Sequence, residues 1–138
     1  KIVLIGRITG ASLERGVRPG LKTNEVAQTI GRSDLDKHIE RLNALDRLTD
    51  DNLPVLLEAH PYLTDLLESI TGLRKRALAS KYLHFHAPKA VFSFDSRADL
   101  RLRRQMPKRN HPILFSGLHD KKFEAFARGC IYYRDHVL

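Results

Sequence analysis

The sequence predicts an all-α protein with a single compact helical domain, and three observations lead to this prediction. A chain of 138 residues suits one domain, and its 42% hydrophobic content suits a buried core. Apolar residues recur twice at spacings of three and four, the period of one helix face. These two stripes are Leu35, Ile39, Leu42 and Leu45, then Leu63, Leu66, Leu67 and Ile70. The sequence divides into about seven predicted helices, and short connections marked by glycine or proline join them. This organisation favours a packed all-α domain.

Residues 1–22 are expected to form an N-terminal extension. Residues 1–8 are apolar, but the run is too short to tell a helix from a strand. Three glycines and Pro19 then predict a loop over residues 9–22. A short helix should follow over residues 23–30, ahead of the helix that carries the first stripe.

The next helix should begin after Asn52 and be interrupted at His60-Pro61, because proline lacks a backbone N–H and clashes with the preceding turn. The second stripe should end at Thr71-Gly72, where glycine suits a left-handed C-cap. A helix over residues 73–84 must then stop before Pro88, since proline disfavours a helical residue ahead of it.

Beyond Pro88 the sequence predicts an extended or irregular segment over residues 91–94. Asp95 or Ser96 should cap a helix that runs to about Arg104. Prolines then bracket a loop over residues 107–117, and a last helix should span residues 120–136. The residues expected to be largely buried are Leu35, Ile39, Leu42, Leu66, Leu67 and Leu83.

Charge divides the chain into two halves. Residues 1–70 carry nine Lys or Arg and eleven Asp or Glu, whereas residues 71–138 carry fifteen and five. A basic surface confined to one half is typical of a protein that binds a polyanion, usually nucleic acid. The alternative is a solvated basic face that has no partner.

Other features of the composition narrow the class of protein. No apolar run reaches the roughly 20 residues that a membrane helix needs, so no membrane partner is expected. Cys130 is the single cysteine, which excludes an internal disulfide and fits a reducing cytoplasm. The histidines show no zinc-ligand spacing, and no metal or other cofactor is expected.

Residues 71–97 carry the most specific pattern, TGLRKRALASKYLHFHAPKAVFSFDSR. A glycine turn at residues 71–74 is followed by a basic helix, and residues 88–91 lead to Asp95 at the start of another helix. This order resembles the helix-hairpin-helix DNA glycosylases, which join a glycine hairpin to a segment running from a proline to an aspartate. The resemblance implies a helix-hairpin-helix element near residues 62–86, DNA as the partner, and excision of a damaged base.

The resemblance also implies that Asp95 is the central carboxylate. A glycosylase must stabilise the positive charge that grows on the deoxyribose as the base leaves, and one carboxylate near C1′ does so. The alternative is that Asp95 is an ordinary N-cap residue, and the two roles are compatible.

Members of the family that also cut the strand use a lysine as an amine nucleophile. An ungapped comparison places Arg76 at that position, and arginine cannot act as an amine nucleophile. Lys75, one residue earlier, and Lys81, further along the helix, are therefore the two candidates; otherwise lyase activity is absent. For all three residues the alternative is a basic helix face that contacts phosphate.

Nucleic-acid contacts are expected in the turn and in the helix after Asp95. Gly72 allows the backbone to approach a phosphate closely, and Arg74 replaces the second glycine of the family pattern. The full set is Gly72, Arg74, Lys75, Arg76, Arg97, Arg101, Arg104, Lys108 and Arg109. Five aromatic residues could form a wall on which a base extruded from the duplex stacks. The alternative is that they belong to the hydrophobic core. They are Phe85, Phe92, Phe94, Tyr132 and Tyr133.

Two other functions stay open. A non-catalytic nucleic-acid-binding module on the same scaffold would explain the missing hairpin glycine and the arginine at the expected lysine position. A helical ribonuclease or toxin-like effector is suggested by the spacing of Arg104 and His111, although Pro107 separates them.

Overall fold

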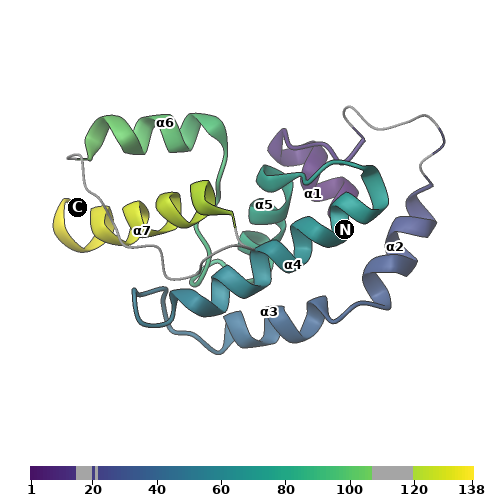
Figure 1. The fold of residues 1–138 in the computed structure, drawn as a ribbon, viewed down its shortest axis with the longest axis horizontal. Coiled ribbons are helices and arrows are strands. Elements are labelled where there is room, and N and C mark those ends of the chain that lie inside the picture. The colour runs from purple at the N-terminus through teal and green to yellow at the C-terminus, as the bar shows by residue number, and fades with distance from the viewer. Residues whose placement is uncertain (15–19, 21, 107–119) are drawn as a thin grey trace.

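Seven α-helices make up the part of the chain described by the computed structural model, residues 1–14, 20, 22–106 and 120–138 (Figure 1). No strand occurs among these residues, so the all-α prediction is confirmed. The helices are α1 (Ile2–Thr9), α2 (Thr23–Gly31), α3 (Leu35–Asn43), α4 (Leu53–Thr71), α5 (Arg76–His86), α6 (Ser96–Gln105) and α7 (Lys121–His136).

The centre of the domain is built on α4. Helix α3 packs along one side of α4, α5 packs along another, and α1 packs on α5 (Figure 1). The two predicted stripes form much of this core: Leu35, Leu42 and Leu67 are buried, as expected, and so is Leu83 of α5. Ile39 and Leu66 are only partly buried, at the margin of the same core.

Helix α1 corrects one part of the expectation for residues 1–22, because residues 2–9 form a helix that packs on α5. Ile2 and Ile5 are buried, and Gly6 lies close to two other segments. A Cβ on Gly6 would come within 2.8 Å of the Ala11 carbonyl oxygen and 3.1 Å of Leu78 Cδ1. The absence of a side chain at Gly6 therefore permits this close packing of α1.

Helix α4 corrects the predicted break at His60-Pro61, because it runs without interruption from Leu53 to Thr71. Proline at position 61 removes one helix hydrogen bond. Nine residues along α4 are buried, so packing on several sides outweighs that loss. His60 is itself buried and stacks on Phe123 of α7 at a ring-centroid distance of 3.6 Å.

Helices α6 and α7 form the opposite end of the molecule from α1 and α2 (Figure 1). A Cβ on Gly129 would lie 2.9 Å from Leu102 Cδ2, so the two helices approach closely there. Phe94, just ahead of α6, packs edge-to-face against Phe123 and Phe126 of α7. These contacts join the segment ahead of α6 to α7, and the His60–Phe123 stack joins α7 to α4.

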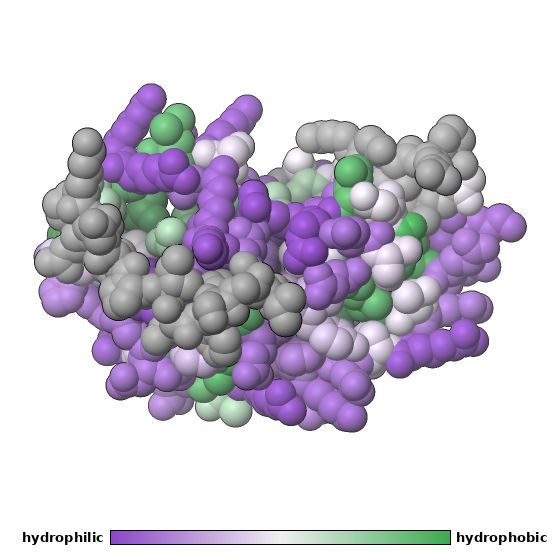
Figure 2. Space-filling view, viewed as in Figure 1, coloured by the Kyte–Doolittle hydropathy of each residue, from purple (hydrophilic) through white to green (hydrophobic). Residues whose placement is uncertain are grey.

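The surface shown in Figure 2 is mainly hydrophilic, with small hydrophobic areas between the charged side chains. Across the described ranges, no helix combines the length and apolar character needed to span a bilayer. The same ranges contain no group of three or more His, Cys, Asp or Glu residues placed to hold a metal ion.

Candidate functional site

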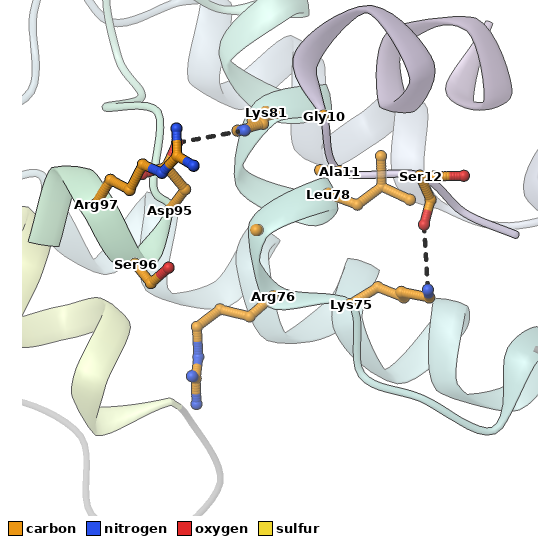
Figure 3. A pocket seen from close by; sticks show the side chains of 11 residues that line it. Gly10, Ala11, Ser12, Lys75, Arg76, Leu78, Lys81, Asp95, Ser96 and Arg97 are labelled. Atoms are coloured by element: carbon orange, nitrogen blue, oxygen red, sulfur yellow. Dashed lines mark hydrogen bonds and ion pairs between the residues drawn. The ribbon is translucent and has the colours of Figure 1, made fainter. Parts of the chain in front are cut away.

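A pocket of about 630 Å³ lies where three segments meet: the turn after α1, the start of α5 and the start of α6 (Figure 3). Its described lining is Gly10, Ala11, Ser12, Lys75, Arg76, Ala77, Leu78, Lys81, Asp95, Ser96 and Arg97. Four of these residues are cationic and one is anionic. Five of the residues singled out from the sequence, Lys75, Arg76, Lys81, Asp95 and Arg97, therefore share one cavity.

Asp95 stands at the start of α6 with both carboxylate oxygens engaged. Its Oδ1 accepts a hydrogen bond from the Ala98 N–H at 2.7 Å, and its Oδ2 lies 3.4 Å from Lys81 Nζ. The Ala98 N–H and the Lys81 ammonium lower the pKa of this carboxyl below its usual value, although partial burial opposes them. Asp95 is thus the N-cap of α6 and a member of an ion pair.

Lys81 is the cation that the fold brings to Asp95. It lies in the middle of α5, and its side chain is 10% exposed. Lysine is rarely so buried without a partner, and the contact with Asp95 supplies one. Of the two lysines proposed from the sequence, Lys81 is the one that contacts the carboxylate.

Lys75 has a different setting, although it lines the same pocket. It precedes α5 with a positive φ of 53°, a left-handed conformation that is unusual for a residue other than glycine. Its Nζ donates to the Ser12 carbonyl at 3.1 Å, across the pocket (Figure 3). Lys75 therefore ties the start of α5 to the segment after α1.

Arg76 points away from Lys81 and Asp95 (Figure 3). Its Nε donates to Asp120, which also accepts the Phe123 N–H and caps α7. Burial raises the pKa of Asp120, but the Arg76 guanidinium and the Phe123 N–H outweigh it, so the net pKa is lowered. The guanidinium also lies 5.9 Å from the centre of the Phe94 ring. Arg76 thus joins α5 to α7 in addition to lining the pocket.

The turn between α4 and α5 covers residues 72–75, so α5 begins at Arg76, three residues later than predicted. Gly72 adopts a φ of 78°, and its N–H bonds to the Glu68 carbonyl at 2.8 Å, which makes it the C-cap of α4. Arg74 is held by two carboxylates, at 2.8 Å from Asp65 and 3.1 Å from Glu68. The structure therefore gives Arg74 an intramolecular role that the sequence did not suggest.

The basic residues of α6 lie on its exposed side. Arg97, Arg101, Arg103 and Arg104 are all exposed, and Arg103 pairs with the buried Asp99 at 2.8 Å. The predicted contacts Lys108 and Arg109, together with His111 of the ribonuclease hypothesis, lie outside the described residues.

The aromatic residues do not form the expected wall for an extruded base. Phe94 is buried in the core, Phe85 is 62% exposed, and neither lines the pocket. Phe92, Tyr132 and Tyr133 are also absent from its lining. The sequence could not distinguish a wall from the core, because aromatic side chains occur in both.

Sequence reasoning missed several residues that shape the site. The segment Gly10–Ser12 forms one wall, although nothing local marks it as part of a site. Asp120 was recognised only as the start of a helix, and its contact with Arg76 spans 44 positions in the sequence. Ser80 was not singled out, although it binds the backbone of Phe94 beside Asp95.

The fold and the pocket define an all-α protein with a cationic cavity that contains a Lys–Asp pair. No protein-family model matches the chain, and no curated protein or solved structure matches it either. Its function is therefore inferred from its own residues.

Proposed function

We propose that this protein binds DNA along α6 and the rim of the pocket, and excises a damaged base from a nucleotide extruded into the pocket. The observation that carries the proposal is the Lys81–Asp95 pair, 3.4 Å apart, inside a cavity with three further cations. The resemblance of residues 71–97 to helix-hairpin-helix glycosylases supports it, because Asp95 is the carboxylate that the resemblance selects.

Asp95 has the charge that base excision requires. As the N-glycosidic bond breaks, positive charge grows on the deoxyribose, and a fixed carboxylate stabilises it. The lowered pKa of Asp95 keeps the group ionised at neutral pH. A side chain bound at both oxygens needs little reorganisation during the reaction.

Lys81 is the amine for a second step. Water replaces the base at C1′, and ring opening of this abasic sugar exposes an aldehyde. Once the Lys81 ammonium has given a proton to solvent, its neutral amine can add to the aldehyde carbon, and loss of water then gives a Schiff base. Since Lys81, and not Lys75, contacts the carboxylate, we assign this role to Lys81.

The exposed arginines of α6 supply charge for the phosphate backbone. Arg97 links the pocket to the exposed side of α6, because it lines the pocket and is exposed like Arg101 and Arg104. Contacts of this kind fix the position of the duplex without reading its sequence. A nucleotide extruded from that duplex would therefore enter beside Asp95.

A non-catalytic DNA-binding module is the second candidate function. The observation that favours it is that Asp95 caps α6 and Lys81 pairs with it, which together give both residues a structural reason to be present. On this alternative the arginines still bind DNA, and no bond is broken.

Single-turnover release from duplexes bearing oxidised and alkylated bases separates the two functions. Base excision predicts release by the unchanged protein, a loss of orders of magnitude in Asp95→Asn, and retained DNA binding. Borohydride should trap a covalent adduct with an abasic duplex, and Lys81→Gln should abolish it. The matched control is Lys75→Gln, which should leave trapping intact. No release across the panel, with DNA binding preserved, would establish the non-catalytic module.

A further inference from the structure

The segment ahead of Asp95 is attached to α5 by a buried serine. Ser80 is fully buried, and its Oγ accepts the Phe94 N–H at 2.8 Å. The same oxygen lies 3.1 Å from the carbonyl oxygens of Phe94 and of Ala77, so its single proton is donated to one of these acceptors at a time. One hydroxyl thereby binds the backbone of Phe94.

His84 repeats this attachment one helical turn later. Its Nδ1 lies 2.6 Å from the Val91 carbonyl oxygen. A carbonyl only accepts, so Nδ1 carries the proton and donates it. Ser80 and His84 are four residues apart and share one face of α5, so they hold residues 91–94 along the helix.

Each partner of the Ser80–Phe94 hydrogen bond is next in sequence to one member of the Lys81–Asp95 ion pair. Lys81 directly follows Ser80, and Asp95 directly follows Phe94. Fixing the Phe94 N–H on Ser80 therefore sets how far Asp95 lies from Lys81. No regular ladder holds this segment, because residues 91–95 belong to neither a helix nor a strand.

We infer that Ser80 is a positioning residue that sets the Lys81–Asp95 distance, with His84 as a second attachment of the same segment. This inference rests on the proposed function for its catalytic consequence. The geometric consequence can be measured in the free protein, without DNA. Ser80 is itself absent from the pocket lining, so it acts on the ion pair through the backbone of Phe94.

An NMR pH titration of the Asp95 carboxyl tests the inference. The lowered pKa of Asp95 depends in part on Lys81, so Lys81→Gln should raise this pKa. That variant is the positive control, because it shows that the Asp95 pKa responds to loss of the ammonium. Ser80→Ala should also raise it, because Asp95 moves away from the ammonium. His84→Ala should raise it less, and Ser80→Thr, which keeps the hydroxyl, should restore the wild-type value.

Tyr62→Phe is the matched control. It removes another hydroxyl that accepts a backbone N–H, that of Asp34 at 2.8 Å, and neither residue lines the pocket. This variant should leave the Asp95 pKa unchanged. A Ser80→Ala protein that is less stable but keeps the wild-type Asp95 pKa would overturn the inference. If Ser80→Ala does not fold, the same titration is made on His84→Ala. A raised Asp95 pKa in that variant supports the inference, and an unchanged one overturns it.

The catalytic consequence is measured separately. Ser80→Ala should slow single-turnover base release at least about tenfold while the Kd for DNA stays within about twofold, because the arginines of α6 are untouched. If wild type releases no base but Ser80→Ala still raises the Asp95 pKa, the positioning role stands and the proposed function fails. Normal release by Ser80→Ala with an unchanged pKa would instead remove the positioning role and leave the function intact.

Discussion

Lys81 Nζ lies 3.4 Å from Asp95 Oδ2, while the other oxygen of Asp95 caps helix α6 through the Ala98 N–H. Lys81 belongs to α5, whereas Asp95 begins α6. One carboxylate therefore caps the start of α6 and also balances the positive charge of a nearly buried lysine. Because the two oxygens have separate partners, substitutions can separate the structural role of Asp95 from its charge.

Asp95→Asn and Asp95→Ala should differ in stability. Asparagine keeps a side-chain oxygen that can accept the Ala98 N–H, whereas alanine removes the cap. Loss of an N-cap costs about 0.5–2 kcal/mol, so we expect Asp95→Ala to lower the free energy of unfolding by at least that much. Urea denaturation should show a smaller loss for Asp95→Asn. Equal losses in both variants would mean that the cap contributes nothing measurable.

If the protein binds DNA as proposed, the exposed arginines of α6 should carry much of the salt dependence of that binding. Removing one bound phosphate from the interface flattens the plot of log affinity against log salt by about 0.9. Six bound phosphates would give a slope of about −5, and replacing Arg97, Arg101 and Arg104 with alanine should flatten it by up to about 3. The control is Arg41→Ala, on α3, where the arginine faces Glu58. An unchanged slope in the triple variant would exclude α6 from the interface.

His60 should make stability depend on pH. Burial lowers its pKa from 6.5 to about 4 in the folded protein, although the Arg76 carbonyl opposes this shift. Between these values the unfolded chain takes up a proton that the folded protein does not, so stability falls as pH drops from 6.5 towards 4. The shift corresponds to about 3 kcal/mol.

Urea denaturation of wild type and His60→Gln at about pH 7 and about pH 4.5 measures this effect. The stability loss on acidification should be clearly smaller in His60→Gln. His38 and His86, whose pKa values are also lowered, act in the same direction in both proteins and cancel in the comparison. The lowered pKa values of Asp95 and Asp120 lie below 3.8, so these carboxyls titrate mostly outside this range. Identical losses in the two proteins would contradict the prediction.

Two leucines should respond very differently to truncation. Leu42 is fully buried, and Leu42→Ala should cost about 2–5 kcal/mol because it removes apolar contacts and leaves a cavity. Leu100 on α6 is 50% exposed, so Leu100→Ala should cost well under that amount. Thermal or urea denaturation measures both. A small effect at Leu42 would show that the α3 stripe is not the core face.

Gly6 should be intolerant of a side chain, whereas Gly31 should accept one. A Cβ at Gly6 would press on the Ala11 carbonyl and displace the wall of the pocket, so Gly6→Ala should destabilise the protein and weaken DNA binding. Gly31 ends α2 with open space around it, and Gly31→Ala should be neutral or stabilising by up to about 1 kcal/mol. Calorimetry and DNA titration compare them. A neutral Gly6→Ala would indicate that α1 can shift without cost.

The sequence alone determined the features that depend on neighbours within a turn or two. The apolar period of α3, the left-handed glycine at the end of α4, the stop before Pro88 and the cap at Asp95 are all local, and each agrees with the structure. The concentration of basic residues after position 70 is likewise a property of composition.

Tertiary structure alone decided which distant residues meet. Packing made residues 2–9 a helix and carried α4 through Pro61, because buried contacts outweigh weak local preferences. It also turned Arg76 towards Asp120 and left Lys81, rather than Lys75, beside Asp95. Residues on different helices meet because of the way those helices pack. The periodicity of a helix shows which residues share one of its faces, but not which other helix packs against that face.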